Sequence, residues 1–234
     1  MPSGAPSRMK GANKREWIEL YVSHLFAMPS GPYSILYADP PWRYRPQGSE
    51  PRPPRAPYRV KQITHPPYPC VSTHDLRAMP IAPLRAKDCT LFLWAIYPML
   101  PDAIRVMAAW GFQYWTRAFT WVKQNPSGEG FHLGTGYWTR ANPEVCLLGV
   151  RGRPMRQQAD VRNLIVSPRR EYSRKPDEAR DRIIALAGDL PRLELFARQK
   201  SEGWAAWGNE IESDIVIDWQ ASTQSLQRSS VEEK

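Results

Sequence analysis

The sequence predicts an α/β fold in which helices cover both faces of a mostly parallel central sheet. Apolar stretches of strand length recur along the chain, and amphipathic stretches with helix-capping residues lie between several of them. The first apolar stretch, "ILYA" at 35–38, has no charged residue, as in strands that are buried on both faces. It ends in "DPPW", and because Pro40 and Pro41 have no N–H to continue a ladder, Asp39 marks the place where the strand stops.

The remaining elements follow from apolar periodicity and capping signals. Strands are expected at 35–38, 88–95, 117–123, 144–152, 163–168 and 191–198, and helices at 14–27, 74–79, 101–110 and 176–187. Asn13 can cap the first helix, and Ser72 or Thr73 can cap the second. A proline in the first turn and a glycine just past the end delimit the last two helices.

Composition favours a soluble globular protein with a polyanionic partner. The chain has 234 residues, 10 of them Trp, which a disordered protein would not carry. Its net charge is +9, and nucleic acid is the usual partner of such a basic chain, although charge alone also fits an ordinary soluble basic protein.

Cysteine and histidine usage points away from disulfides and structural metals. Cys70, Cys89 and Cys146 are far apart and form no CxxC pair, which fits a reducing cytoplasm. The four histidines have no metal-ligand spacing, so no zinc site is expected. The N-terminus lacks a signal core, and the longest apolar run, at 90–100, is too short to span a bilayer. We therefore expect a cytoplasmic protein that binds no membrane.

A single domain is expected at 13–213, between a disordered basic arm at 1–12 and a polar C-terminal tail at 214–234. Within it, residues 43–69 hold eight prolines and six cations against one acid, Glu50, and cannot build a core. Long loops of this kind are usually functional or disordered, so this segment is either a substrate-facing loop, which we favour, or a solvated insertion.

The "DPPW" turn suits chemistry on an exocyclic amine such as N6 of adenine. The Asp39 carboxylate and the Pro40 carbonyl could accept the two amine hydrogens, and the prolines would hold these acceptors rigid. Trp42 offers a flat face on which an extruded base can stack. A purely structural turn is the competing interpretation.

Two other segments carry unusual charges. In "SRKP" at 173–176, Lys175 falls near the start of a helix, where the dipole disfavours a cation and a bound anion would relieve the conflict. The alternative is that Lys175 points into water. Glu194, inside an apolar strand, needs a partner, either the hydroxyls of a ribose or a nearby arginine. No G-x-G-x-x-G or Walker motif is present.

Taken in order, several segments between about 33 and 212 resemble the MT-A70 family of S-adenosylmethionine-dependent adenine-N6 methyltransferases, most closely its single-domain bacterial and phage members. The segments are "YADPPWRY", "YPCVSTHDL", "LFLWA", "FTWVK", "GTGYWTRANPEVCLLGVRG", "REYSRKPDEARDRI" and "LELFARQKSEGWAAWGNE". The resemblance implies a Rossmann-like, circularly permuted class I methyltransferase fold with S-adenosylmethionine as its cofactor.

The resemblance also implies roles for individual residues. Catalysis would belong to Asp39, Pro40, Pro41 and Trp42. The cofactor would be bound by Asp39, Lys175, Glu194, Arg198, Ser201, Asn209 and Glu210, with Lys175 on the methionine carboxylate. Substrate would contact Trp42, Tyr44, Tyr68, Glu144, Arg43 and Arg45. The chain departs from common family residues at Arg174 (often His), Ser201 (Asn in some members) and Glu210 (commonly Gln).

Adenine-N6 methylation of DNA is the function we expect from this resemblance, with RNA as an alternative. Basic segments at 151–156 and 167–170 could contact phosphates. A non-catalytic nucleic-acid-binding partner is a further alternative, against which the intact "DPPW" and Lys175 argue. A protein-amide methyltransferase is another, against which Trp42 and the basic loop argue. The sequence leaves open the target motif and whether the protein is a monomer, a homodimer or one subunit of a larger enzyme.

Overall fold

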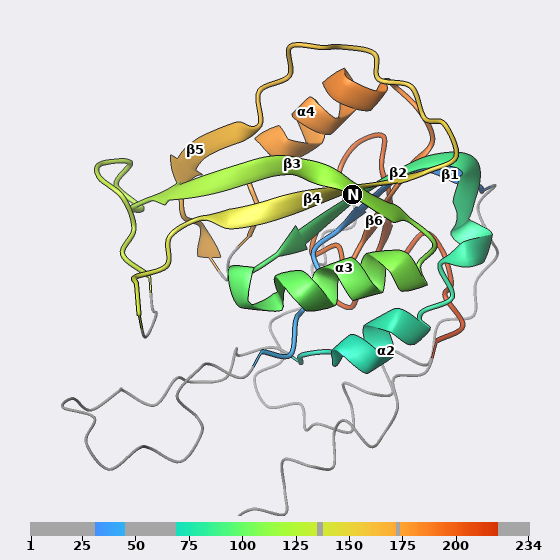
Figure 1. The fold of residues 1–234 in the computed structure, drawn as a ribbon, viewed down its shortest axis with the longest axis horizontal. Coiled ribbons are helices and arrows are strands. Elements are labelled where there is room, and N and C mark those ends of the chain that lie inside the picture. Colours follow the sequence, from blue (N-terminus) through green and yellow to red (C-terminus); the bar gives the residue numbers. More distant parts are fainter. Residues whose placement is uncertain (1–30, 45–68, 135–137, 172–173, 220–234) are drawn as a thin grey trace, which may run out of the picture.

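The computed structural model describes residues 31–44, 69–134, 138–171 and 174–219, and these form a layered α/β structure around one sheet (Figure 1). The strands are β1 (Tyr33–Ala38), β2 (Arg85–Ala95), β3 (Gln113–Gln124), β4 (Glu144–Arg151), β5 (Leu164–Pro168), β6 (Arg192–Leu195) and β7 (Ala205–Trp207). Their order in the sheet is β5-β3-β4-β2-β1-β6-β7.

The sheet is mixed, because β4 runs against all the other strands. It pairs antiparallel with β2 and β3, whereas β1 pairs parallel with β2 and β6, β6 with β7, and β3 with β5. The predicted α/β class and predominance of parallel strands are therefore confirmed. The permuted methyltransferase topology stays a prediction.

Helices cover the two faces of the sheet unequally. α2 (Thr73–Ala78) and α3 (Leu100–Ala109) lie on one face, and α4 (Glu178–Ala187) lies on the other (Figure 1). α3 buries Ala103, Val106 and Met107 in the larger apolar cluster, at the spacing of one helix face. α4 contributes Ala179, Ile183 and Ala187 to the second cluster in the same way. Short 3₁₀ turns, Ala82–Leu84 and Tyr97–Met99, flank β2.

A side-chain cap explains where α2 begins, whereas α4 begins without one. Ser72 caps α2, since its hydroxyl accepts a hydrogen bond from the Asp75 N–H at 3.1 Å. Ser72 is one of the two caps predicted for this helix. α4 begins at Glu178, two residues later than predicted, with Asp177 as its N-cap and Pro176 just before it. Lys175 therefore lies in the approach to the helix.

The C-terminal boundary also differs from the expectation of a polar tail after residue 213. Ile215, Ile217 and Trp219 are buried in the larger cluster, and the Trp219 indole donates to the Asp75 carbonyl at 3.2 Å. The Asp214 N–H donates to Ala206 in β7, so the segment covers the edge of the sheet there. β7 itself, three residues long, was not predicted.

Several other expectations concern residues outside the described ranges: the arm at 1–12, the helix at 14–27 and most of the proline-rich loop. In the part of the chain that is described, no helix is long and apolar enough to cross a membrane. Cys89 and Cys146 are buried free thiols.

Candidate active site

Strand direction brings the site residues to one edge of the sheet. β1, β2, β3 and β6 end at this edge, whereas the antiparallel β4 begins there. Asp39 follows the last residue of β1, Lys123 is the next-to-last residue of β3, and Glu144 is the first residue of β4. Ligands of open α/β sheets bind at this kind of edge, so the converging charges mark the candidate site.

Lys175 is the centre of the site. Its ammonium lies 2.8 Å from Asp39 Oδ2 and 3.1 Å from Glu144 Oε2, and its side chain is only 9% exposed. The two carboxylates raise the pKa of Lys175 despite the opposing effect of burial. The anions that compensate Lys175 are thus protein carboxylates. The sequence had suggested either a bound anion or water at Lys175, and neither alternative included these carboxylates.

Glu144 is held by two lysines. Burial raises the pKa of its carboxyl, but the ammonium groups of Lys175 and Lys123 outweigh burial and lower that pKa to about 2. Lys123 pairs with Oε1 while Lys175 pairs with Oε2, so both carboxylate oxygens are engaged. Glu144 is therefore a permanently charged part of the site at neutral pH.

Asp39 is the more accessible carboxylate, with 30% of its side chain exposed. Burial of the carboxyl raises its pKa, the Lys175 charge opposes this, and the neighbouring Glu144 adds to it. Among the described residues, Lys175 alone gives its carboxylate a side-chain hydrogen bond, and it uses Oδ2. Asp39 Oδ1 is consequently the acceptor that a ligand can reach without displacing Lys175.

The turn after Asp39 is fixed by backbone hydrogen bonds. The Trp42 N–H donates to the Pro40 carbonyl at 2.8 Å, and the Val71 N–H donates to the Pro41 carbonyl at 2.8 Å. A carbonyl oxygen has two lone pairs, so Pro40 keeps one acceptor position. The turn is thus rigid, with Pro40 buried within it.

Trp42 itself packs inward. Its ring belongs to the larger apolar cluster with 7% exposure, and its indole N–H donates to the Trp94 carbonyl at 2.9 Å. The Trp94 indole in turn donates to the Tyr37 hydroxyl at 2.8 Å. In this arrangement Trp42 anchors the turn to β2, and stacking of a base on its face, which stays a prediction, would require the ring to be uncovered.

A second ion pair, between Arg180 and Glu194, joins α4 to β6. Arg180 of α4 binds both oxygens of Glu194 in β6 at 2.7 Å, and its guanidinium lies 5.6 Å from the centre of the Tyr37 ring. The Glu194 side chain is 8% exposed and that of Arg180 is 12% exposed. Of the two partners considered for Glu194, the structure supplies the arginine.

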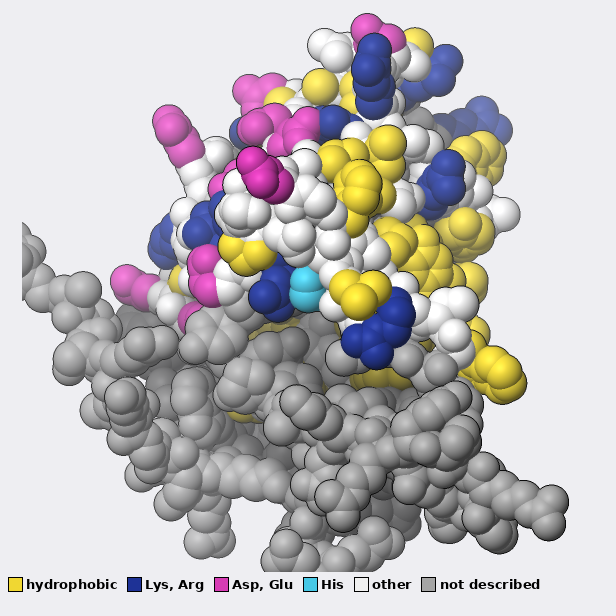
Figure 2. Space-filling model, turned by 90° about the vertical axis from the view of Figure 1, so that its left-hand side faces the viewer, with side chains coloured by type: hydrophobic (Ala, Val, Ile, Leu, Met, Phe, Trp, Pro, Cys, Tyr) yellow, Lys and Arg dark blue, Asp and Glu magenta, His cyan; other side chains and the backbone are white. Residues whose placement is uncertain are grey.

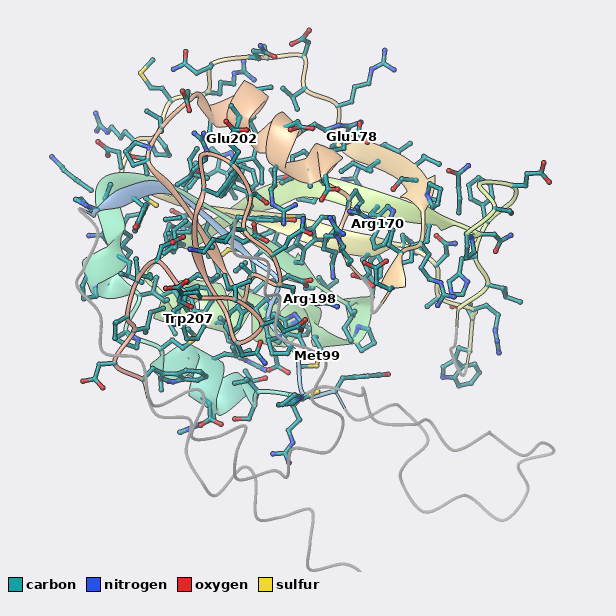
Figure 3. The ribbon with its side chains drawn as sticks, turned by 180° about the vertical axis from the view of Figure 1, so that it is seen from behind. Met99, Arg170, Glu178, Arg198, Glu202 and Trp207 are labelled. Carbon is teal, nitrogen blue, oxygen red and sulfur yellow. The ribbon has the colours of Figure 1, made fainter. Side chains whose placement is uncertain are left out.

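The loop after β6 reaches the same edge beside Asp39. Ala38 and Leu195 are register partners, and Phe196, the next residue, has a φ of 62°, which is unusual for a residue other than glycine. Strained positions of this kind cluster at functional sites. Arg198, two residues further on, is labelled in Figure 3. Its Nε lies 3.3 Å from Glu210 Oε1.

The loops after β6 and β7 pack closely at this point. The Ala197 N–H donates to the Trp207 carbonyl at 2.9 Å, and a Cβ on Gly208 would come within 2.0 Å of the Ala197 carbonyl oxygen. Only glycine fits there. The contact carries Asn209 and Glu210 towards Arg198, while Ser201 lies partly buried in the loop between the two strands.

The remaining predicted residues are distributed as follows. Arg43 is exposed and Tyr44 half-buried, directly after the turn, whereas Arg45 and Tyr68 lie outside the described residues. Lys123, Arg180 and Trp94 take part in the site and were not identified from the sequence. In the described ranges, no three His, Cys, Asp or Glu side chains are grouped so that they could hold a metal ion.

Comparison with known proteins agrees with the resemblance seen in the sequence. The MT-A70 family model matches residues 33–210. The type II methyltransferase M.MunI from a Mycoplasma species is 31% identical over 201 residues, covering 81% of this chain and 82% of that protein. The human N(6)-adenosine-methyltransferase catalytic subunit METTL3 is 27% identical over 87% of this chain but only 32% of its own length.

A rice protein, a probable N(6)-adenosine-methyltransferase MT-A70-like, is 26% identical over 87% of this chain and 26% of its own length. This chain therefore spans about a third or less of those two eukaryotic relatives. The matched region includes every element that forms the site, from β1 to the loop after β7. On this evidence the chain belongs to the MT-A70 family.

Proposed function

We propose that the protein transfers the methyl group of S-adenosylmethionine to N6 of adenine in DNA. Methyltransferase activity and this methyl donor go with membership of the MT-A70 family. The observation that carries the proposal for this chain is the Asp39 carboxylate, held by Lys175 at the strand edge with one oxygen left for a ligand and a rigid proline carbonyl beside it.

The donor set fits the cofactor. S-adenosylmethionine has an ammonium, a carboxylate and ribose hydroxyls, and the edge offers anionic, cationic and neutral polar groups close together. We assign Asp39 and Lys175 to the amino-acid end, and Arg198, Ser201, Asn209 and Glu210 to the nucleoside. Glu194 would meet the ribose only by giving up an oxygen now bound by Arg180, so we assign it to that pair. When bound, the cofactor supplies an electrophilic methyl group on its sulfonium.

Asp39 and Pro40 orient the target amine. Asp39 Oδ1 and the remaining lone pair of the Pro40 carbonyl accept its two hydrogens, which directs the nitrogen lone pair towards the methyl group. The surplus proton leaves to Asp39 or to water after transfer. A raised pKa suits Asp39 to this role, because burial makes the carboxylate a better proton acceptor.

DNA is preferred because the bacterial relative, which aligns over most of its length, is named as a type II methyltransferase, a term used for enzymes that modify DNA. A target base in duplex DNA would have to be flipped into the site. Figure 2 shows the side of the molecule that carries the β3–β4 connection and β5, where apolar side chains alternate with Lys and Arg. Exposed Phe131 and Trp138 in that connection, with exposed Arg140 and Arg169, suit contacts to bases and phosphates.

The test is product analysis with labelled S-adenosylmethionine. Purified protein is incubated with unmethylated duplex DNA, single-stranded DNA and RNA, and each product is digested and examined for N6-methyladenine. We expect label in DNA that is lost with Asp39→Ala. Label only in RNA would keep the chemistry and overturn the substrate, which is the second candidate because the eukaryotic relatives are adenosine methyltransferases. Cofactor binding without any label would overturn the nucleic-acid proposal.

A further inference from the structure

Lys123 occupies a position at the strand edge that is set by its backbone. Its N–H donates to Asn142 Oδ1 at 2.9 Å, and its carbonyl accepts from Asn142 Nδ2 and from the His132 N–H, both at 2.8 Å. The Asn142 side chain thus makes the two hydrogen bonds that the backbone of a neighbouring strand would otherwise make to Lys123, two residues before Glu144. This clamp brings the side chain of Lys123 to the start of β4.

The Lys123 ammonium is committed to Glu144. It pairs with Glu144 Oε1 and lies 5.1 Å from the centre of the Trp121 ring, on the same face of β3. The side chains of Lys123 and Glu144 are 14% and 8% exposed, so the Lys123 charge would be costly without Glu144.

The four charged groups form an alternating series, Lys123, Glu144, Lys175 and Asp39, with two positive and two negative charges. Without Lys123, the Lys175 ammonium would be the one cation of the series, with two carboxylates at 2.8 and 3.1 Å competing for it. Coulomb attraction at such similar distances gives neither carboxylate a clear advantage.

We propose that Lys123 is a positioning residue for methyl transfer: by neutralising Glu144 it leaves Lys175 shared with Asp39 and keeps Asp39 ionised as an amine acceptor. The inference rests on the proposed function for its effect on catalysis. The charge balance that it describes belongs to the protein without ligand and can be measured there.

A charge balance predicts a pH effect with a definite sign. Removal of Lys123 leaves the series with a net charge of −1, which favours proton uptake by a carboxylate and moves the acid limb of the activity profile to higher pH. Other titratable or charged groups also face the series. They are Tyr37 on β1, Cys146 on β4, Glu194 on β6, Arg198 after β6, and His132 and Arg169 beside Lys123. Of these groups, His132 is affected directly, because the Lys123 charge helps to lower the pKa of its imidazole and that pKa would rise in Lys123→Met.

The test compares Lys123→Met, Lys123→Arg and a control, Lys87→Met, in which an exposed lysine of β2 is removed. Single-turnover methyl transfer is followed against pH. We expect the acid limb of Lys123→Met to move up by about one pH unit or more, and that of Lys123→Arg to stay with the wild type. An unmoved limb, or one moved to lower pH, would overturn the proposal.

A second measurement needs no activity. The thermal midpoint of the ligand-free protein is followed from pH 3 to pH 6. In the wild type the midpoint rises with pH. The reason is that the pKa of Glu144 is lower in the folded than in the unfolded protein, so ionisation of this carboxyl stabilises the folded state. In Lys123→Met this rise is reduced, and in Lys123→Arg it returns. An equal rise in all variants would overturn the role of Lys123 even if no methyl transfer by the wild type were found.

Discussion

Two buried ionic groups lie close together in this protein and are built differently. The Arg180–Glu194 pair is closed: each carboxylate oxygen accepts a hydrogen bond from one guanidinium nitrogen at 2.7 Å, and the two side chains are only 12% and 8% exposed. The series from Lys123 to Asp39 is open at one end, where 30% of the Asp39 side chain is exposed and one oxygen remains for a ligand.

This difference indicates that the closed pair supports the fold and that the open series is suited to chemistry. A bidentate pair uses the hydrogen-bonding capacity of its carboxylate, fixes α4 against β6 and has nothing left to offer a substrate. A series of charges that ends in a partly exposed acceptor keeps its last member ionised and aimed at the strand edge. We therefore expect substitutions in the closed pair to change stability first, and substitutions in the open series to change activity first.

Lys175→Met should have the largest effect on activity. It removes the cation shared by Asp39 and Glu144, and we expect kcat/KM to fall by about 10²–10³-fold, comparable to the loss of one preorganised electrostatic contact in other enzymes. Initial rates over a range of cofactor concentrations measure it. Lys200→Met, which breaks the exposed pair with Asp214, is the matched control and should leave kcat/KM unchanged.

Arg180→Met should have the largest effect on stability. It leaves Glu194 buried without its partner, and we expect a loss of about 3–5 kcal/mol of unfolding free energy. Urea unfolding measures the loss, with Arg105→Met, which breaks an exposed pair on α3, as control. Methyl transfer per folded molecule should persist. If it vanished while stability held, the closed pair would belong to the chemistry.

Glu144→Gln should remove a pH-dependent part of the stability. The Glu144 pKa is depressed from 4.5 to about 2, which corresponds to about 3 kcal/mol that is present above pH 4.5 and lost as pH falls to about 2. The variant should therefore show a flatter stability curve in this window. Unfolding free energies at pH 2.5, 3.5 and 5 test it. Glu178→Gln, on the exposed face of α4, should follow the wild-type curve.

Trp42→Phe should have the smallest effect. It removes one buried hydrogen bond, to the Trp94 carbonyl, with an expected loss of about 1–2 kcal/mol. Trp110→Phe is a matched control, since the Trp110 indole makes an equivalent buried bond to the Leu76 carbonyl away from the site. Equal destabilisation with slower methyl transfer only in Trp42→Phe would support the anchoring role. Equal activity in the two variants would contradict it.

The sequence predicted the parts of the site that depend on local signals. Prolines end β1 directly after Asp39, and the charge conflict near the start of α4 identified Lys175. Pairings between residues far apart in the chain, such as Lys123 with Glu144 or Arg180 with Glu194, depend on strand order and on the direction of β4, which local patterns do not contain.

Two features of the fold were missed for different physical reasons. β7 has three residues, too few for a periodic signal, and it forms because β6 offers an edge. The buried segment before residue 220 did carry a signal, since Ile215, Ile217 and Trp219 alternate with other residues at the spacing of an extended chain. The polar residues at the end of the chain, "SSVEEK", made the whole segment after residue 213 resemble a polar tail.

The most direct test of the distinction between the two ionic groups is a parallel measurement on Asp39→Asn and Glu194→Gln. Both replace a carboxylate by its amide, and each variant is assayed for single-turnover methyl transfer per folded molecule and for its thermal midpoint. We predict that Asp39→Asn abolishes transfer at a nearly unchanged midpoint, whereas Glu194→Gln lowers the midpoint and retains transfer. The reverse pattern, or a weakened affinity for S-adenosylmethionine in Glu194→Gln at an unchanged midpoint, would contradict the account.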